Sequence, residues 1–162
     1  MDKREKNQKI TEYICAGLMI GIPLLIALVV ALVGFVKTGL FPEPGLKWND
    51  EAAYLQMIKN CITTGQPVGY WGFNGNHALV GTGGAWSPAI IWPYAVFAFV
   101  FPITGGFVYY VNLFYITLAN LIFWICVRPS KANSLKIALT QATSAVFILY
   151  LSVNMSEIFR YA

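Results

Sequence analysis

The chain has 162 residues, of which 57% are hydrophobic and only 11% are charged. Soluble domains carry about 25% charged residues, so this composition excludes an ordinary soluble domain and predicts an all-α integral membrane protein. The formal net charge is +4, but the basic residues flank apolar segments, where they set orientation and contact lipid headgroups. We therefore expect a lipid bilayer, and no nucleic acid, as a partner.

The first apolar segment, residues 14–36, contains 23 residues without a charge. About 20 such residues suffice to cross a bilayer, so this segment is predicted to be the first span. Residues 1–12 carry four Lys/Arg residues, and the positive-inside rule places this tail in the cytoplasm. Within the span, Gly17 and Gly21 form a small-xxx-small pair that could pack closely against another helix.

Residues 37–87 are predicted to form a large extracytoplasmic loop that carries one juxtamembrane helix, at about residues 50–63. Asn49 is a good N-cap for this helix, and Gly65 followed by Pro67 is a suitable stop. We expect the helix to lie on the membrane surface through its apolar side chains, which are Ala53, Leu55, Met57, Ile58 and Ile62.

The segment that follows contains 40 residues without a charge, 88–127. A single helix of that length would be about 60 Å long, twice the hydrocarbon core, so two spans are predicted. The complete prediction is four transmembrane helices in one membrane domain: 14–36, 88–103, 106–127 and 135–153, with a basic linker at 128–134 and a tail at 154–162.

Loop charge and segment length disagree about this topology. Four spans with a cytoplasmic N-terminus put Arg128, Lys131 and Lys136 outside, whereas the positive-inside rule prefers them inside and would make one segment within 88–127 re-entrant. We follow segment length, because the first segments usually dominate orientation, and predict four spans.

An acidic pair, Asp50-Glu51, lies shortly before the 68 uncharged residues from Asn60 to Val127. A carboxylate near a low-dielectric region has a tunable pKa, so Asp50 is a candidate general base or metal ligand. The alternative is an ordinary helix start, where negative charge is favoured.

The loop also contains candidate ligand-binding residues. Trp71 and Trp86 could stack on a sugar and Asn74 could donate hydrogen bonds to it, although an interfacial aromatic belt has the same composition. His77 could contact a phosphate, or it could be a loop histidine with no such role. The three cysteines, Cys15, Cys61 and Cys126, make neither a disulfide framework nor a Cys/His metal site.

The order of these features resembles the N-terminal part of a GT-C type membrane glycosyltransferase, the superfamily of protein mannosyltransferases and lipid A aminoarabinose transferases. The resemblance covers about residues 10–155. It rests on the acidic pair with a nearby tyrosine, the proline-led second span and the short basic linker: Asp50-Glu51 with Tyr54, Ser87-Pro88 to Tyr94, Phe101-Pro102, and Arg128 to Lys131.

The resemblance implies a bacterial cytoplasmic-membrane enzyme that transfers a sugar, with inversion, from a polyprenyl-phosphate-linked donor to an extracytoplasmic acceptor. Asp50 would deprotonate the acceptor hydroxyl, and Glu51 and Tyr54 would support the site. No nucleotide cofactor is used in this group, and some members require a divalent metal.

This chain departs from the family pattern in two ways. Many members have a lysine before the second span that engages the donor phosphate, and this chain has none between Lys59 and Arg128, which leaves His77 as the candidate replacement. Family members also have more spans. The chain would then be the front of a longer transferase, a subunit that needs a partner, or an inactive relative. A non-catalytic assembly subunit is the competing interpretation.

Overall fold

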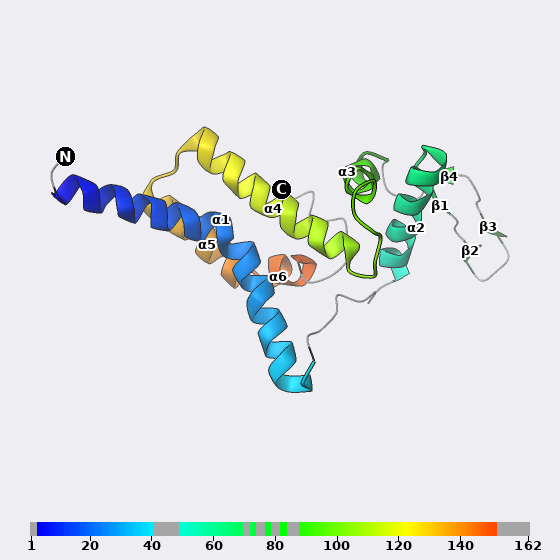
Figure 1. The fold of residues 1–162 in the computed structure, drawn as a ribbon, viewed down its shortest axis with the longest axis horizontal. Coiled ribbons are helices and arrows are strands. Elements are labelled where there is room, and N and C mark those ends of the chain that lie inside the picture. The colour runs from blue at the N-terminus through cyan, green and yellow to red at the C-terminus, as the bar shows by residue number, and fades with distance from the viewer. Residues whose placement is uncertain are drawn as a thin grey trace. The chain divides into compact units, whose positions relative to one another are not determined.

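The protein is described by a computed structural model that covers residues 3–40, 49–69, 72–73, 77–78, 82–83 and 88–151. These residues are mainly helical (Figure 1). The helices are α1 (Lys3–Thr38), α2 (Asn49–Thr64), α3 (Pro88–Ala98), α4 (Phe107–Val127), α5 (Lys131–Thr143) and α6 (Ala145–Leu151). Four two-residue strands, β1 (Val68–Gly69), β2 (Gly72–Phe73), β3 (His77–Ala78) and β4 (Thr82–Gly83), form two antiparallel pairs, β1 with β4 and β2 with β3.

The chain divides into two compact units, and the boundary falls within α4. The first unit contains α1, α5, α6 and the part of α4 from Leu113 onward. In it, α5 lies alongside the N-terminal half of α1 (Figure 1). The buried apolar side chains of this unit come from all four helices: Ala16, Met19, Ile116, Ala138 and Leu151.

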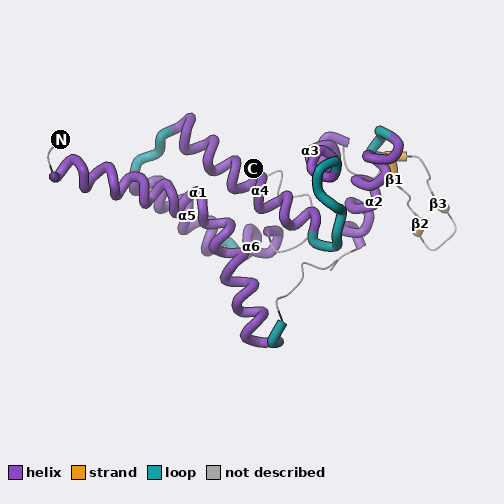
Figure 2. The backbone as a smooth tube through the Cα atoms, viewed as in Figure 1, coloured by secondary structure: helices purple, strands orange, loops and turns teal. Residues whose placement is uncertain are grey.

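Two local features change the direction of helices in the first unit. Helix α1 contains Pro23 and is visibly bent (Figure 2), because proline lacks an amide hydrogen and its ring displaces the carbonyl four residues earlier. Helices α5 and α6 meet at 71°. Ser144 lies between them: its amide donates to the Thr140 carbonyl at 3.0 Å, and its hydroxyl accepts from the Phe147 amide at 3.2 Å. One serine therefore ends α5 and caps α6.

The second unit contains α2, α3, the strands and the first residues of α4. Helix α2 ends where the sequence predicts, because Gly65 adopts φ +76° and its amide donates to the Cys61 carbonyl at 3.0 Å. Helix α2 packs against α3. The largest fully buried apolar side chains described in this unit are Tyr54, Met57, Ile58, Ile91, Tyr94 and Val108.

Two helices in the described part of the chain are long and apolar enough to cross a membrane, α1 from Arg4 and α4, and α5 with α6 makes a third if the bent pair counts as one span. The prediction of four spans is therefore not confirmed. The predicted second span, 88–103, contains only the 11-residue helix α3. At 1.5 Å per residue α3 is about 16 Å long, about half of the hydrocarbon core.

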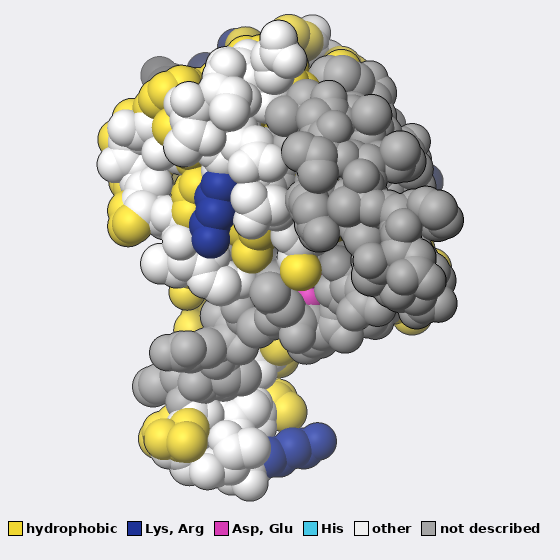
Figure 3. Space-filling view, turned by 90° about the vertical axis from the view of Figure 1, so that its right-hand side faces the viewer, with side chains coloured by type: hydrophobic (Ala, Val, Ile, Leu, Met, Phe, Trp, Pro, Cys, Tyr) yellow, Lys and Arg dark blue, Asp and Glu magenta, His cyan; other side chains and the backbone are white. Residues whose placement is uncertain are grey.

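The surfaces of the two long helices are apolar. Large hydrophobic side chains are exposed along the second half of α1 and the second half of α4, among them Leu24, Leu28, Val36, Ile122 and Ile125. Figure 3, which faces the right-hand side of Figure 1, shows hydrophobic side chains at the surface of the described residues on that side as well. Exposing this apolar surface to water is unfavourable, whereas contact with lipid carries no such cost. The structure therefore supports membrane association.

Candidate functional site

The predicted acidic pair lies in the first turn of α2. Asp50 is the second residue of the helix, and its side chain lies outside the described part of the structure. Glu51 is described and its exposed fraction is 0%. Tyr54, one turn later, is exposed by 1%. The structure therefore brings two of the predicted site residues onto one buried helix face.

The buried face of α2 differs from the predicted one. Glu51, Tyr54, Ile58 and Cys61 follow one another at spacings of three and four residues and are all buried. Leu55 and Met57 flank them and are also buried. This face packs within the unit, in which α2 contacts α3, so Leu55, Met57 and Ile58, three of the five side chains expected to face lipid, are buried in protein. On this face α2 therefore contacts protein, and one of the buried side chains, Glu51, is a carboxylate. The position of the helix at the membrane surface stays a prediction.

The environment of α2 is apolar enough to change the chemistry of a thiol. Burial raises the pKa of Cys61 above its ordinary value of 9.0, because the thiolate would lose its hydration. Cys61 is ten residues after Glu51, on the same helix face. A carboxylate on this face is costly to bury unless polar groups of the protein receive it.

A buried polar pair was not predicted from the sequence. The hydroxyl of Tyr94, on α3, donates to Oδ1 of Asn112, on α4, at 2.6 Å, and both residues are exposed by 0%. The sequence signal was present, since Asn112 is one of two amides in the uncharged residues 88–127. The pair joins α3 to the start of α4 and adds a second polar feature to the same unit.

The side chains of the loop residues proposed for sugar binding are not described by the structure. Trp71, Asn74 and Trp86 lie outside the described residues. His77 is in β3, where it pairs with Phe73 of β2, and its side chain is not described. Their roles stay predictions.

Some GT-C enzymes use a divalent metal, which protein side chains would have to bind. Among the described residues, no group of three or more His, Cys, Asp or Glu side chains could hold a metal ion.

The second amide of the uncharged segment holds the first unit together. Asn120, on α4, is 7% exposed; its Nδ2 donates to the Met19 carbonyl at 2.9 Å and to Gln141 Oε1 at 3.1 Å. Gln141 Nε2, on α5, donates back to Asn120 Oδ1 at 3.0 Å. Met19 is four residues before Pro23, so its carbonyl is the one that proline deprives of a helical partner. Asn120 supplies the missing donor and ties three helices together.

Comparisons with known proteins add no relative. No protein-family model, curated protein or solved structure matches the chain.

Proposed function

We propose that this chain is a membrane glycosyltransferase, or the N-terminal part of one, which transfers a sugar from a polyprenyl-phosphate-linked donor to an extracytoplasmic acceptor. The observation that supports the proposal is the buried carboxylate of Glu51 beside Asp50, with Tyr54 one turn later. A helix start on a protein surface gains from an exposed acid, but it has no need to bury one. A catalytic site that uses a charge in a low-dielectric environment does need a buried acid.

The proposed reaction is a single displacement. An acceptor hydroxyl oxygen attacks the anomeric carbon and forms the new glycosidic bond, while the bond from that carbon to the phosphate oxygen breaks. The leaving group is the polyprenyl phosphate, and the hydroxyl proton passes to the Asp50 carboxylate. Glu51 and Tyr54 act as positioning residues, because their burial fixes the first two turns of α2. Stacking of the sugar on Trp71 or Trp86, hydrogen bonds from Asn74, and phosphate binding by His77 complete the proposed site.

The membrane arrangement that we propose differs from four crossings. The start of α1 and the end of α4 lie together in the first unit: Glu12 Oε1 is 4.0 Å from Lys131 Nζ, and the rings of Tyr13 and Trp124 are 6.4 Å apart. If α1 and α4 both cross, the two ends share one side of the membrane. Everything between them, including the large loop, α2 and α3, then lies on the other side, which is extracytoplasmic by the positive-inside rule.

The test of sugar transfer is Asp50→Asn in membranes that contain the full chain. The assay supplies a polyprenyl-phosphate sugar and follows both the release of polyprenyl phosphate and the label on the acceptor. Removing a general base should lower the rate by about 100-fold or more. Glu51→Gln should lower it less, since Gln keeps the shape and the hydrogen bonds. Glu5→Gln, which removes an exposed acid on α1, is the charge-matched control. A wild-type rate in Asp50→Asn would remove Asp50 from the mechanism.

A non-catalytic assembly subunit is the second candidate function, and an open face of α1 favours it. A side chain at Gly17 or Gly21 would meet nothing within 4 Å, so no described helix of this chain occupies the small-xxx-small surface. Such surfaces allow close helix packing in membranes. Gly17→Leu and Gly21→Leu should then dissociate a partner without disturbing the chain's own packing. A complex that keeps its size on gel filtration in both variants would contradict an assembly role for this surface.

A further inference from the structure

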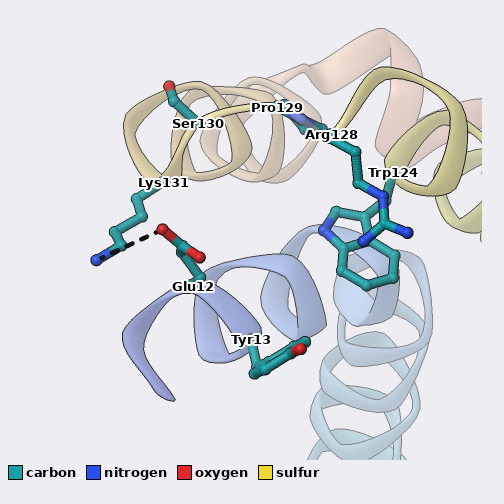
Figure 4. Close-up of a pocket in the computed structure, with 7 residues that line it drawn as sticks. All are labelled: Glu12, Tyr13, Trp124, Arg128, Pro129, Ser130 and Lys131. Atoms are coloured by element: carbon teal, nitrogen blue, oxygen red, sulfur yellow. Dashed lines mark ion pairs between the residues drawn. The ribbon is translucent and has the colours of Figure 1, made fainter. Parts of the chain in front are cut away.

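A pocket of about 230 Å³ lies at the end of the first unit where α4 turns into α5. Figure 4 shows its residues. Glu12 and Tyr13 of α1 form one wall, and the α4–α5 turn forms the other with Trp124, Arg128, Pro129, Ser130 and Lys131. None of these residues belongs to the site proposed for sugar transfer. The pocket contains two cations and one carboxylate, so its net charge is positive.

Arg128 is held in a fixed position by its surroundings. Its guanidinium carbon lies 4.8 Å from the centre of the Trp124 ring, and its Nε donates to the Ile125 carbonyl at 3.2 Å. The backbone of Arg128 adopts φ +50°, an uncommon conformation for a residue with a side chain. These contacts use one face of the guanidinium and one of its nitrogens. The two terminal nitrogens remain available as a fork that matches two oxygens of a phosphate.

The turn adds further positive character. Ser130 is the N-cap of α5, with its hydroxyl accepting from the Asn133 amide at 3.4 Å, so the positive end of the helix dipole is beside the pocket. Lys131 reaches Glu12 only at 4.0 Å, with the two side chains exposed by 34% and 63%. An exposed pair at this distance is weak, and the Lys131 ammonium can turn from the carboxylate to an anion.

The position of the pocket along the helices points to the class of ligand. Immediately after Tyr13, α1 begins its uncharged apolar segment at Ile14, and the last residue of the apolar α4 is Val127. Ile14, Ile125 and Val127 are each exposed by half or more. Tyr13 and Trp124 are the aromatic residues expected at the boundary between headgroups and acyl chains. The cations therefore lie at headgroup depth, beside a surface that acyl chains would cover.

From this geometry we infer that the pocket binds the phosphate of an anionic phospholipid headgroup, with Arg128 and Lys131 as its cationic contacts. The acyl chains lie along the exposed apolar residues of α1 and α4. The bound lipid bridges the start of α1 to the α4–α5 turn, beside the weak Glu12–Lys131 pair and the Tyr13–Trp124 ring contact. This inference is independent of sugar transfer and holds for either proposed function.

The experiment uses the purified full chain in neutral detergent, titrated with dioctanoyl phosphatidylglycerol. Dioctanoyl phosphatidylcholine and inorganic phosphate are titrated in parallel, and bound adducts are counted by native mass spectrometry. Phosphatidylglycerol should saturate one site. Arg128→Gln and Lys131→Gln should each weaken it by about tenfold, since each removes a charged hydrogen-bond donor. Lys136→Gln, which removes a lysine of the same helix that does not line the pocket, should leave binding unchanged.

A gain-of-binding variant keeps the inference testable if Arg128→Gln fails to fold. Glu12→Gln removes the carboxylate from the pocket and should tighten phosphatidylglycerol binding severalfold. Equal loss in Lys136→Gln and Lys131→Gln would show general charge attraction and overturn the inference. Inorganic phosphate that competes at the lipid's own affinity would show that free phosphate, not a lipid headgroup, is the ligand. Equal binding of phosphatidylcholine would overturn the role of net negative charge.

Discussion

The three cysteines lie in three different surroundings, and this difference makes Cys61 a reporter of the second unit. Cys61 is buried, Cys15 is partly buried and Cys126 is exposed on an apolar helix. Burial both shields the Cys61 thiol and raises its pKa above 9.0. Reaction requires the thiolate, so the two effects act in the same direction.

We predict that Cys61 resists a water-soluble maleimide in the folded chain and reacts after unfolding. In a variant that keeps only Cys61, the folded rate should stay below the unfolded rate at every pH up to 9, measured by mass shift over time. The raised pKa also means that the native state retains the proton longer. The contribution of the protonated Cys61 thiol to the stability of the folded chain is therefore complete below pH 9, and it is lost as the pH rises through the folded-state pKa.

Equal rates for the folded and unfolded chain would contradict the described packing of α2 on α3. The matched control is a Cys-free chain with Gln66→Cys, which places an exposed thiol two residues beyond the end of α2. That thiol should react at the same rate before and after unfolding. Cys61 and Gln66 lie close in sequence, so a difference between them reports burial and not local composition.

At the scale of helices, the contact between Asn120 and the bend of α1 makes a quantitative prediction. Asn120→Ala removes the donor from the Met19 carbonyl and breaks the reciprocal pair with Gln141. Hydrogen bonds between helices in membranes contribute about 0.6 kcal/mol each and at most about 1.7 kcal/mol. We expect Asn120→Ala to lower the free energy of unfolding by about 1–2 kcal/mol, measured by denaturant titration in mixed micelles.

Pro23→Ala tests whether the proline is the reason for the contact. Alanine restores an amide that can donate to the Met19 carbonyl, so the loss of Asn120 should cost less in the Pro23→Ala background than in the wild type. Asn133→Ala, an exposed amide on α5, serves as the control. Costs that simply add in the double variant would show that Asn120 and Pro23 act independently.

The elements that were predicted well are those with a local cause. The stop at Gly65 needs only a residue that tolerates positive φ, and the helix predicted at about 50–63, which is Asn49–Thr64 in the structure, needs only helix-forming residues. Helix α3 was predicted too long, because residues 88–103 are uniformly apolar. The local signal was Pro102, which disfavours the helical conformation at Phe101; the chain leaves α3 with turn hydrogen bonds from Val100 and Phe101 to the Phe97 carbonyl.

The contacts that were not predicted depend on residues far apart in sequence. Met19 and Asn120 are separated by 101 positions, and Tyr94 and Asn112 by 18. Each amide stands out in an uncharged segment, but its partner is fixed only when helices pack. The same holds for Glu51: a helix-start interpretation explains its position in the sequence, whereas its burial follows from the packing of α2 within its unit.

For the whole molecule, the proposed arrangement of two crossings before the α4–α5 turn follows loop charge more closely than segment length. The pairing of Glu12 with Lys131 sets the basic α4–α5 turn beside the end of the basic N-terminal segment, as the positive-inside rule prefers. Four crossings would place them on opposite sides of the bilayer. The short helix α3 supports this proposal, because an 11-residue helix is too short for a full crossing and leaves α1 and α4 as the candidate spans before the turn.

Cysteine labelling in sealed, right-side-out vesicles tests this topology. In a background without native cysteines, Gln8→Cys and Ala132→Cys should both be protected from an impermeant maleimide, whereas Gln66→Cys should react from outside. All three positions are exposed in the structure, so their reactivity reports the side of the membrane and not burial, and all three should react once the vesicles are permeabilised. Four crossings predict instead that Ala132→Cys reacts together with Gln66→Cys. That result would separate the start of α1 from the α4–α5 turn. It would also remove the lipid pocket that Glu12, Arg128 and Lys131 form together, because the two walls of that pocket must share one side of the bilayer.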